Sequence, residues 1–352
     1  MAAQKYMHGV QLLGHGDLDQ LVWNEKIPVP LAGPGEVLVK VLAAGVNNTD
    51  INTRLGWYAK EVTGATDTAP TNNVADGGWG GALPFPLVQG GDLCGEVVKI
   101  GSGVTGFAIG MRVICANVQP EPTAENPHKY AVIGSEYDGA FAQYCVVPAR
   151  HLYNVTTSPL TDIEMAAVPC AYGTAMGLLR RAGVGAADRV LITGASGGVG
   201  MACVQLAKIA GAAITGVAGP AKQAAVRGAG ADHVISRSDV PEHGFFDVVI
   251  DVVGGPAWGD LIEALASGGR YAVAGAIAGP IVTGDLRTIY LNDLSLYGST
   301  FQPADGFAAL VAMVNQGGVR PLVSKTYPLR DIHAAQTDFL SKSYPGKLVL
   351  IP

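Results

Sequence analysis

The spacing of hydrophobic positions changes near residue 160. Before it, short apolar runs rich in β-branched residues (37–42, 96–100 and 111–115) are separated by Gly, Asn and Pro turns. Closely spaced short strands of this kind predict a barrel or sandwich. From Asp162 on, helical spacing over 162–182 is followed by alternating strand-like and helix-like segments. That alternation predicts a parallel sheet with helices on both faces, and therefore an α/β fold.

The second part of the chain resolves into individual elements. Expected strands are 189–193, 213–217, 233–235, 246–251 and 270–274, and expected helices are 198–209, 222–228 and 258–266. After about residue 300 the pattern predicts helices over 306–315 and 330–340, an extended segment over 324–329 and a terminal strand over 347–351.

Residues 59–82 interrupt the strand pattern. This stretch holds Thr, Asn, Asp and Gly without an apolar period. A loop of this length inside a compact domain is uncommon, and is usually either functional or disordered. Because Trp57, Tyr58 and Trp79 bracket it, the loop is a candidate lid or partner contact.

Composition narrows the class of protein. Apolar residues make up 49% of the 352 positions and charged residues 15%, which excludes an intrinsically disordered chain. The net charge of −6 makes nucleic acid an unexpected partner. No run approaches the ~20 apolar residues of a membrane helix, and the first residues lack an apolar signal core, so we expect a cytoplasmic protein. The five cysteines form no CxxC pair, which argues against a disulfide framework or a cysteine-rich zinc lobe.

The sharpest motif lies between a strand and a helix. Ala195, Gly197 and Gly200 form A-x-G-x-x-G directly after the strand at 189–193. Small residues let a dinucleotide pyrophosphate approach the backbone at a helix N-terminus. The expected contacts are therefore Ala195, Ser196, Gly197, Gly198, Val199 and Gly200. The alternative is a tight strand–helix turn, which the following βαβ pattern disfavours.

The end of the second strand indicates which dinucleotide binds. NAD sites usually place Asp or Glu there, whereas this segment has no carboxylate and carries Lys222 and Arg227. We therefore expect NADPH, with these cations near the 2′-phosphate; the alternative for Lys222 is a solvated lysine at a helix start. Further contacts are expected where strands end, at Gly219, Val253, Gly275 and Phe301.

Several motifs occur together in a specific order. They are 34–40, 43–47, 91–98, 101–104, 139–144, 194–200 with 205–208, and 346–350. In this order and spacing the chain resembles the medium-chain dehydrogenase/reductase superfamily, and within it the zinc-independent quinone oxidoreductase branch. The resemblance implies a GroES-like domain (1–152 and 300–352), a Rossmann domain (153–299), an active site in the cleft, and a homodimer paired through the Rossmann sheet edge.

The resemblance also bears on a metal. Zinc members of the family bind their catalytic metal with a Cys, the His of Gly-His-Glu and a later Cys. The matching positions here are Asn47, Gly91 and Cys170, so one sulfur is kept. A catalytic zinc needs three protein ligands, so we expect none here and expect Cys170 to be a buried, small apolar residue.

Without a metal, the easier reaction is reduction of a conjugated carbonyl or quinone, in which charge develops on an oxygen remote from the hydride. The resemblance implies Asn47 and Tyr58 as catalytic residues and Thr174 as a nicotinamide-ribose contact. Asn47 would donate its amide to the substrate or the cofactor, and Tyr58 would position the substrate and supply a proton. The structural alternatives are capping for Asn47 and rim packing for Tyr58, while Asp50 is expected to cap a helix over 51–55.

Other functions remain open at this stage. A 2-enoyl thioester reductase shares the fold but needs a cationic channel for the CoA diphosphate, and no obvious one is seen. A zinc alcohol dehydrogenase and a non-catalytic NADPH-binding sensor are the remaining alternatives.

Overall fold

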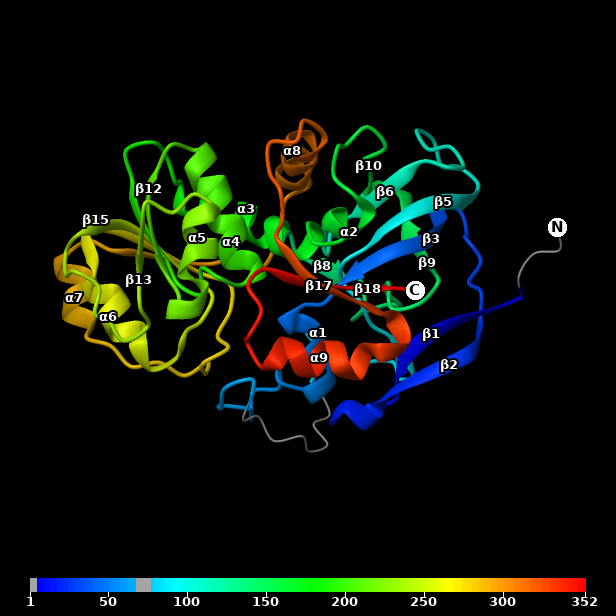
Figure 1. Ribbon diagram of the computed structural model, residues 1–352, viewed down its shortest axis with the longest axis horizontal. Helices are drawn as coiled ribbons and strands as arrows, with labels where there is room; N and C mark the ends of the chain where they lie inside the picture. The colour runs from blue at the N-terminus through cyan, green and yellow to red at the C-terminus, as the bar shows by residue number, and fades with distance from the viewer. Residues whose placement is uncertain (1–4, 68–76) are drawn as a thin grey trace. The chain divides into compact units, whose positions relative to one another are not determined.

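The computed structural model describes residues 5–67 and 77–352 and divides into two compact units. Unit 1 comprises Met1–Val62, Pro70–Cys170 and Pro303–Pro352, and unit 2 comprises Thr63–Ala69 and Ala171–Gln302 (Figure 1). The main boundaries between the units therefore lie after Cys170 and before Pro303. The sequence-based boundaries lie at 152 and 300. Part of the 59–82 loop lies outside the described residues; its described ends form turns and bends.

Unit 1 is built from β-strands. A first sheet, in the order β2-β1-β4, contains β1 (Tyr6–Leu12), β2 (Leu21–Pro28) and β4 (Leu87–Val88). A second sheet, in the order β10-β6-β5-β3-β18-β17 with β9 on β3, contains β3 (Glu36–Gly45), β5 (Cys94–Ile100), β6 (Arg112–Cys115), β9 (Tyr144–Pro148), β10 (Leu152–Asn154), β17 (Val323–Pro328) and β18 (Lys347–Ile351). A separate hairpin pairs β7 (Val118–Pro120) with β8 (Tyr130–Val132).

The C-terminal strand completes the sheet begun near the N-terminus. β18 pairs antiparallel with the end of β3, with Val349 opposite Gly45 and Leu350 opposite Ala44. The side chains of Leu348, Val349 and Leu350 are buried. This pairing brings the first residue of β18 beside the residues that follow β3.

The helices of unit 1 are short. They are α1 (Asn48–Leu55), α2 (Asp162–Met165), α8 (Ala304–Asn315) and α9 (Ile332–Leu340), with single 3₁₀ turns at Leu18–Gln20, Ala149–His151 and Leu329–Asp331. The helix expected over 162–182 is divided, because α2 ends at Met165 and α3 (Pro169–Ala182) begins anew at a proline. Proline fits the first turn of a helix, where its missing N–H has no intrahelical partner.

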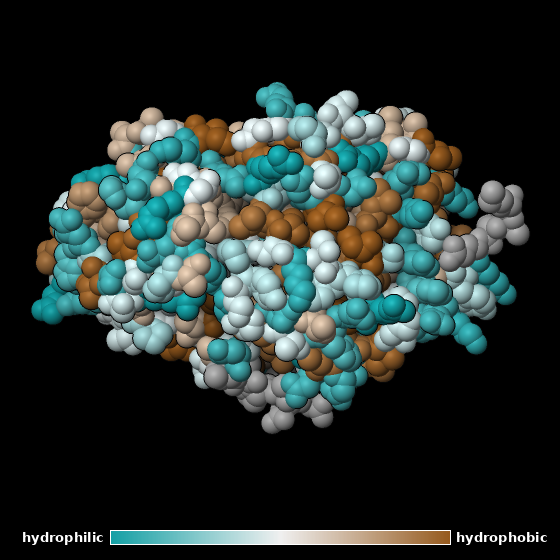
Figure 2. Space-filling model, viewed as in Figure 1, coloured by the Kyte–Doolittle hydropathy of each residue, from teal (hydrophilic) through white to brown (hydrophobic). Residues whose placement is uncertain are grey.

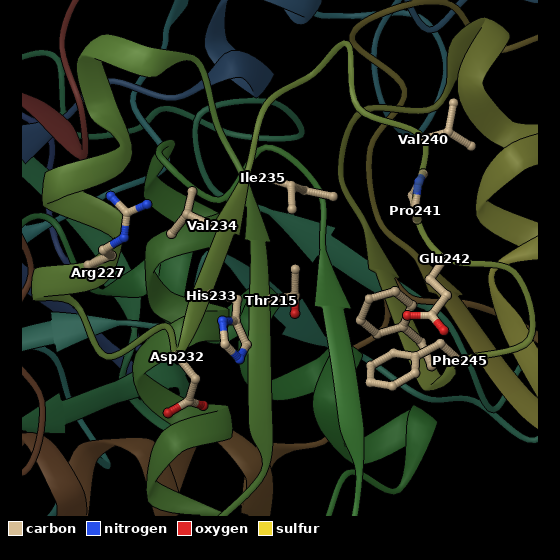
Figure 3. Close-up of a pocket in the computed structure, with 11 residues that line it drawn as sticks. Thr215, Arg227, Asp232, His233, Val234, Ile235, Val240, Pro241, Glu242 and Phe245 are labelled. Carbon is tan, nitrogen blue, oxygen red and sulfur yellow. The ribbon is translucent and has the colours of Figure 1, made fainter.

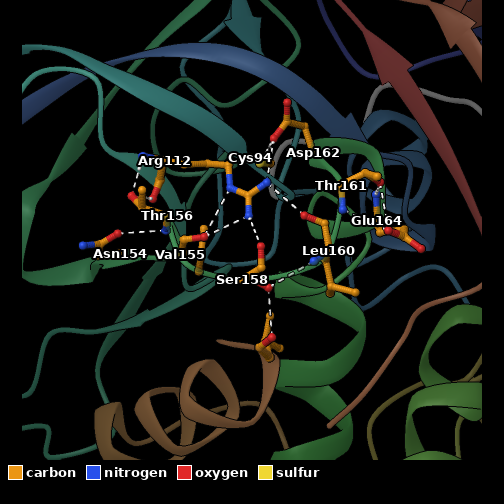
Figure 4. Close-up of polar contacts among 11 residues, drawn as sticks. Cys94, Arg112, Asn154, Val155, Thr156, Ser158, Leu160, Thr161, Asp162 and Glu164 are labelled. Atoms are coloured by element: carbon orange, nitrogen blue, oxygen red, sulfur yellow. Dashed lines mark hydrogen bonds and ion pairs between the residues drawn. The ribbon is translucent and has the colours of Figure 1, made fainter. Parts of the chain in front are cut away.

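Arg112 holds residues 155–162 in unit 1. Its guanidinium donates to the carbonyl oxygens of Val155 at 3.0 Å, Ser158 at 2.8 Å and Leu160 at 2.9 Å, and pairs with Asp162 at 3.1 Å (Figure 4). One side chain of β6 thus fixes the segment that leads into α2. Sequence periodicity does not report such side-chain to main-chain contacts.

Unit 2 is a parallel sheet in the order β13-β12-β11-β14-β15-β16. Its strands are β11 (Arg189–Ile192), β12 (Ala213–Val217), β13 (His233–Ile235), β14 (Phe246–Asp251), β15 (Leu265–Val273) and β16 (Ser295–Gly298). Its helices are α3 from Ala171 on, α4 (Gly198–Ile209), α5 (Gln223–Gly228), α6 (Trp258–Glu263) and α7 (Leu286–Leu291), with 3₁₀ turns at Pro220–Lys222 and Gly255–Ala257.

Consecutive residues of the central strands are all buried, including Val190 to Ile192 of β11 and Val248 to Ile250 of β14. Both faces of the sheet are therefore covered, and the predicted α/β fold with a parallel Rossmann sheet is confirmed. Within the described residues, no helix is long and apolar enough to cross a bilayer.

Candidate active site

The junction between β3 and α1 places Asn47 at the start of a helix. Asn47 has an extended backbone (φ −128°, ψ 159°) and is the N-cap of α1. Asp50, in the first turn, accepts the backbone N–H of Asn47 at 2.8 Å. The expectation that Asp50 caps a helix over 51–55 is therefore wrong: the helix begins three residues earlier, and Asp50 closes its first turn from inside. Capping, the alternative considered for Asn47, is what the backbone shows.

A buried polar cluster surrounds Asn47. The Lys347 ammonium donates to Val46 O at 3.0 Å, to Asn47 Oδ1 at 2.5 Å and to Asp92 Oδ2 at 2.8 Å. Asn47 Nδ2 donates to Asp92 Oδ2 at 2.9 Å and lies 3.4 Å from Gly45 O. All three ammonium hydrogens thus have acceptors, and the Asn47 amide is held in one orientation.

Asp50 is the second carboxylate near Lys347, and it has no cation of its own. Burial raises the pKa of Asp50 to about 7, and the negative charge of Asp92 adds to the effect, against the backbone hydrogen bond from Asn47 and the charge of Lys347. Because Lys347 is already paired with Asp92, ionised Asp50 would leave a net negative charge in the cluster. Asp50 therefore changes its charge near neutral pH.

Cys170 joins the same cluster through its backbone. Its N–H donates to Asp92 Oδ1 at 2.6 Å, at the beginning of α3. Burial, reinforced by the charge of Asp92, raises the pKa of the Cys170 thiol to about 12. A thiol with this pKa is protonated at neutral pH and is a poor nucleophile.

The residues at the three zinc-matching positions do not fit a zinc ion. At Gly91, an added Cβ would lie 2.2 Å from Asn117 Nδ2, so Asn117 fills the space that a side chain would need. At Asn47, the amide oxygen accepts a hydrogen bond from a lysine. Among residues 5–67 and 77–352, no group of three or more His, Cys, Asp or Glu side chains is placed to hold a metal ion.

Tyr58 lies beside this cluster. It follows α1, whose C-cap Gly56 has a left-handed backbone (φ 71°). The phenol hydrogen-bonds the side chain of Asn52, and the Cys170 and Asp50 side chains lie close enough to raise its pKa. Burial raises the pKa of Tyr58 well above its ordinary value, so the phenol keeps its proton. Both predicted catalytic residues, Asn47 and Tyr58, therefore belong to one region of unit 1.

The glycine turn of unit 2 lies between β11 and α4, as expected. An added Cβ on Gly200 would lie 2.2 Å from Gly194 O, so a larger residue there would disrupt the turn. Gly197 is the N-cap of α4 and has no side-chain capping bond. Ala195 and Ser196 are buried, while Gly197 is exposed. The turn thus offers bare backbone and unpaired helix N–H groups, which fits the pyrophosphate of a dinucleotide.

Asp251 holds the strand ends next to this turn. Its carboxylate accepts from Thr193 Oγ1 at 2.6 Å, Val253 N at 2.8 Å and the Tyr271 hydroxyl at 2.7 Å. These bonds tie together the carboxyl ends of β11, β14 and β15. They also bring Val253 to the turn, because an added Cβ on Gly194 would lie 3.1 Å from Val253 Cγ2.

The remaining predicted contacts of unit 2 also lie at element ends. Gly275 follows β15, and an added Cβ there would lie 3.0 Å from Val252 O. Thr174, in α3, and Phe301 are both half-buried. Their neighbours Gly173 and Gln302 pack together, since a Cβ on Gly173 would lie 2.7 Å from Gln302 Oε1.

Two cations lie at the carboxyl ends of β12 and β13. Burial lowers the pKa of Lys222, and the positive charge of Arg237 lowers it further. The segments that carry them are linked by Gln223 Nε2, which donates to Ser236 Oγ at 3.2 Å. Beside them, Gly219 has no heavy atom within 4 Å of an added Cβ, which leaves open space. Sequence reasoning missed Arg237, although it lies two residues after the end of an expected strand.

Arg227 has a different environment. It donates to Gln223 Oε1 at 3.4 Å and lines a cavity of about 440 Å³. The connection from β13 to β14 has no helix, and this cavity lies along it; Val234, Asp232 and Arg227 line one part, and Glu242 and Phe245 line another (Figure 3). No residue of the glycine turn lines this cavity. As a coenzyme contact, Arg227 stays a prediction.

Comparison with known families identifies both parts of the chain. Residues 33–157 match the alcohol dehydrogenase GroES-like domain, and residues 198–316 match a family described as zinc-binding dehydrogenase. The expected GroES-like domain is thereby confirmed.

Relatives match over nearly the whole length. The acryloyl-coenzyme A reductase of Metallosphaera sedula is 32% identical, with 91% of this chain and 93% of the relative covered. The quinone oxidoreductase of Sus scrofa is 28% identical, with 99% and 98% covered. A solved structure of a Sinorhizobium meliloti protein is 40% identical and superposes with a TM-score of 0.89 over 100% of this chain and 98% of that one. An NAD-dependent alcohol dehydrogenase structure is 28% identical, with a TM-score of 0.85 and coverage of 98% and 100%.

Proposed function

Since the chain belongs to the medium-chain dehydrogenase/reductase family of oxidoreductases, we propose that it is an NADPH-dependent, zinc-free reductase of quinones and α,β-unsaturated carbonyl compounds. The observation that carries the proposal is the Lys347–Asp92–Asn47 cluster, in which Asn47, at one of the positions of the family's metal ligands, accepts a hydrogen bond from a paired ammonium group. Protonated Tyr58 lies beside that cluster. Such a site lacks a Lewis acid for an alkoxide but has a neutral proton donor.

The coenzyme would be held by unit 2. The Gly194–Gly200 backbone would bind the pyrophosphate, and Lys222 with Arg237 would bind the 2′-phosphate of NADPH. When bound, NADPH supplies the hydride, which carries both electrons to the acceptor. Two cations close enough for the charge of Arg237 to lower the pKa of Lys222 support the phosphorylated coenzyme.

Residues of unit 1 would bind and protonate the acceptor. As the β-carbon of an enone gains the hydride, negative charge forms on its carbonyl oxygen, and the Tyr58 phenol would donate its hydrogen bond and then its proton there. The hydrogens of the Asn47 amide point to Asp92 and Gly45, so Asn47 would act as a positioning residue rather than as a substrate donor. This differs from the role that the resemblance implies.

A second candidate is a 2-enoyl thioester reductase. The 32% identity to an acryloyl-coenzyme A reductase over 91% of the chain favours it. The chemistry is the same, with hydride added to the β-carbon and a proton to the enolate, so the two functions differ in the acceptor alone.

A steady-state assay tests both candidates. Purified protein is mixed with NADPH or NADH and with a benzoquinone, a simple enone, acryloyl-coenzyme A or a primary alcohol. We expect NADPH oxidation with the quinone or enone, while faster turnover of acryloyl-coenzyme A would select the thioester reductase. Binding of NADPH without turnover of any acceptor would favour a sensor, and metal-dependent alcohol oxidation would favour a zinc alcohol dehydrogenase.

The edge of the Rossmann sheet supports the proposed homodimer. Apolar side chains are exposed on and around α7 and the edge strand β16, namely Ile281, Leu286, Tyr290, Leu291 and Leu296. The surface over α7, at the left of Figure 2, shows hydrophobic residues among hydrophilic ones. Light scattering would show a mass of twice 36.1 kDa if two copies pair.

A further inference from the structure

We propose that Trp79 is a positioning residue for Tyr58, so that the distal end of the long 59–82 segment takes part in proton delivery. This inference rests on the proposed function, because it assigns Tyr58 as the proton donor. Trp79 would act by fixing the plane of the Tyr58 ring, and not by touching the acceptor.

The Tyr58 ring is held by two indoles at different angles. Trp79 lies parallel to it, with 11° between the planes and 5.5 Å between the centroids. Trp57 meets it edge-on, at 82° and 5.6 Å. Offset-stacked and edge-to-face pairs are both favourable aromatic geometries. Together they oppose rotation of the ring in two directions.

Trp79 is itself fixed by a tight turn. Gly78 and Gly81 exchange hydrogen bonds, N to O, at 3.0 and 3.4 Å, so that Trp79 and Gly80 form the tip. The Gly80 N–H donates to Glu136 Oε1 at 3.0 Å. The other oxygen of Glu136 accepts the Val132 N–H at 2.7 Å, which anchors the carboxylate to β8. The stacked indole is therefore part of an ordered contact.

Gly77 seats the same segment against the end of α1. An added Cβ on Gly77 would lie 2.4 Å from the Cα of Gly56 and 2.8 Å from His15 Nε2. Gly56 is the C-cap of α1 and lies two positions before Tyr58. The segment thus contacts both the backbone that leads to Tyr58 and its ring.

The position of the Tyr58 phenol gives this contact a chemical consequence. Asn52 hydrogen-bonds the phenol, and the Cys170 and Asp50 groups lie close enough to act on its pKa. A proton donor must be aimed at the acceptor oxygen to act in the transition state. Loss of the stacked indole would let the ring turn away and would lower the rate more than the affinity for the acceptor.

The test compares W79A, W79F, Y58F and W79A/Y58F with wild type, using an acceptor that wild type reduces. We expect W79A to lower kcat on the order of tenfold with KM changed less, and W79F to stay within about threefold because a phenyl ring can still stack. In the Y58F background, W79A should have no further effect on kcat, because Trp79 acts through the phenol. Circular dichroism of each variant confirms folding.

W23A is the matched control. Trp23 is also half-buried in unit 1, packs edge-on against His8 at 5.7 Å, and lies in β2. We expect its kcat to equal that of wild type. If W79A lowers kcat equally with and without the Tyr58 hydroxyl, or leaves it unchanged, Trp79 is not a positioning residue although the proposed function stands. If wild type reduces no acceptor, the proposed function fails first and this inference fails with it.

Discussion

Lys347 Nζ lies 2.8 Å from Asp92 Oδ2, and the side chains of this pair are 4% and 0% exposed. The ammonium comes from the first residue of the C-terminal strand and the carboxylate from the segment before β5. Their pairing therefore ties β18 to the segment before β5 and fixes the Asn47 amide in one arrangement. Because a buried charge without a partner is costly, this pair is a sensitive point for stability.

Removing one member of the pair should destabilise the fold strongly. K347M leaves the Asp92 carboxylate uncompensated, and we expect the free energy of unfolding to fall by about 3–5 kcal/mol. In K347M/D92N the uncompensated charge is absent, so part of that loss should return. Urea unfolding measures both variants. Equal stability of the single and double variants would show that the charge on Asp92 is not what makes the lysine necessary.

The raised pKa of Asp50 predicts how the stability of the folded chain changes with pH. Its pKa is about 7 in the folded chain against an ordinary value of 3.8, so the unfolded chain releases the proton first as pH rises. Asp50 therefore stabilises the folded chain most below pH 4. As pH rises from 4 to 7, its contribution to the free energy of unfolding should decrease by at most about 4 kcal/mol.

The variant D50N isolates that contribution. An amide oxygen can still accept the Asn47 N–H but does not ionise. Unfolding free energies of wild type and D50N should diverge between pH 4 and pH 7, with D50N gaining relative to wild type. Parallel curves over that range would show that Asp50 does not titrate near neutrality.

Coenzyme preference should depend on Arg237 as well as Lys222. Because both cations would contact the 2′-phosphate, K222A and R237A should each raise the Kd for NADPH about tenfold and leave the Kd for NADH nearly unchanged. Coenzyme fluorescence titrations measure both constants. R227A is the informative comparison, since Arg227 lines the separate cavity along β13. A larger loss of NADPH affinity in R227A than in R237A would reverse the assignment.

Substitution of Asp251 should disturb the strand ends at which the coenzyme would bind. In D251N an amide nitrogen replaces one of two oxygens that accept hydrogen bonds from Thr193, Val253 and Tyr271. We expect a loss of about 1–3 kcal/mol of stability, because a buried donor is left unpaired, together with weaker coenzyme binding. Thermal unfolding with and without NADPH measures the two effects. Unchanged binding would show that the network does not shape the coenzyme site.

Local sequence patterns predicted much of unit 2, but not α7 or β16, and the helix expected over 258–266 ends at Glu263, before β15 begins at Leu265. The helix at 198–209 and the strands at 213–217, 233–235 and 246–251 have their predicted bounds, because a βα repeat with glycine turns encodes each element within a few residues. In unit 1 the strands β1 and β2 were not predicted, since they carry polar residues and a glycine between their apolar positions.

Less of the candidate site could be predicted from the sequence. Lys347 lies 300 residues from Asn47 and 255 from Asp92, and no local pattern reports such a contact. Arg237 likewise faces Lys222 through the pairing of neighbouring strands. Asp is a common residue at the N-cap, which favours Asp50 there, but the earlier residue Asn47 satisfies the same preference and is the cap that the structure shows.

The most direct test of the central claim combines metal analysis with turnover. Protein purified with zinc in the medium is analysed for metal and then assayed for NADPH-dependent reduction of a quinone or enone, before and after dialysis against a zinc chelator. We predict zinc well below one ion per chain and the same rate before and after chelation. One zinc per chain, with activity lost on chelation and restored by zinc, would contradict a metal-free site built around Lys347, Asp92 and Asn47.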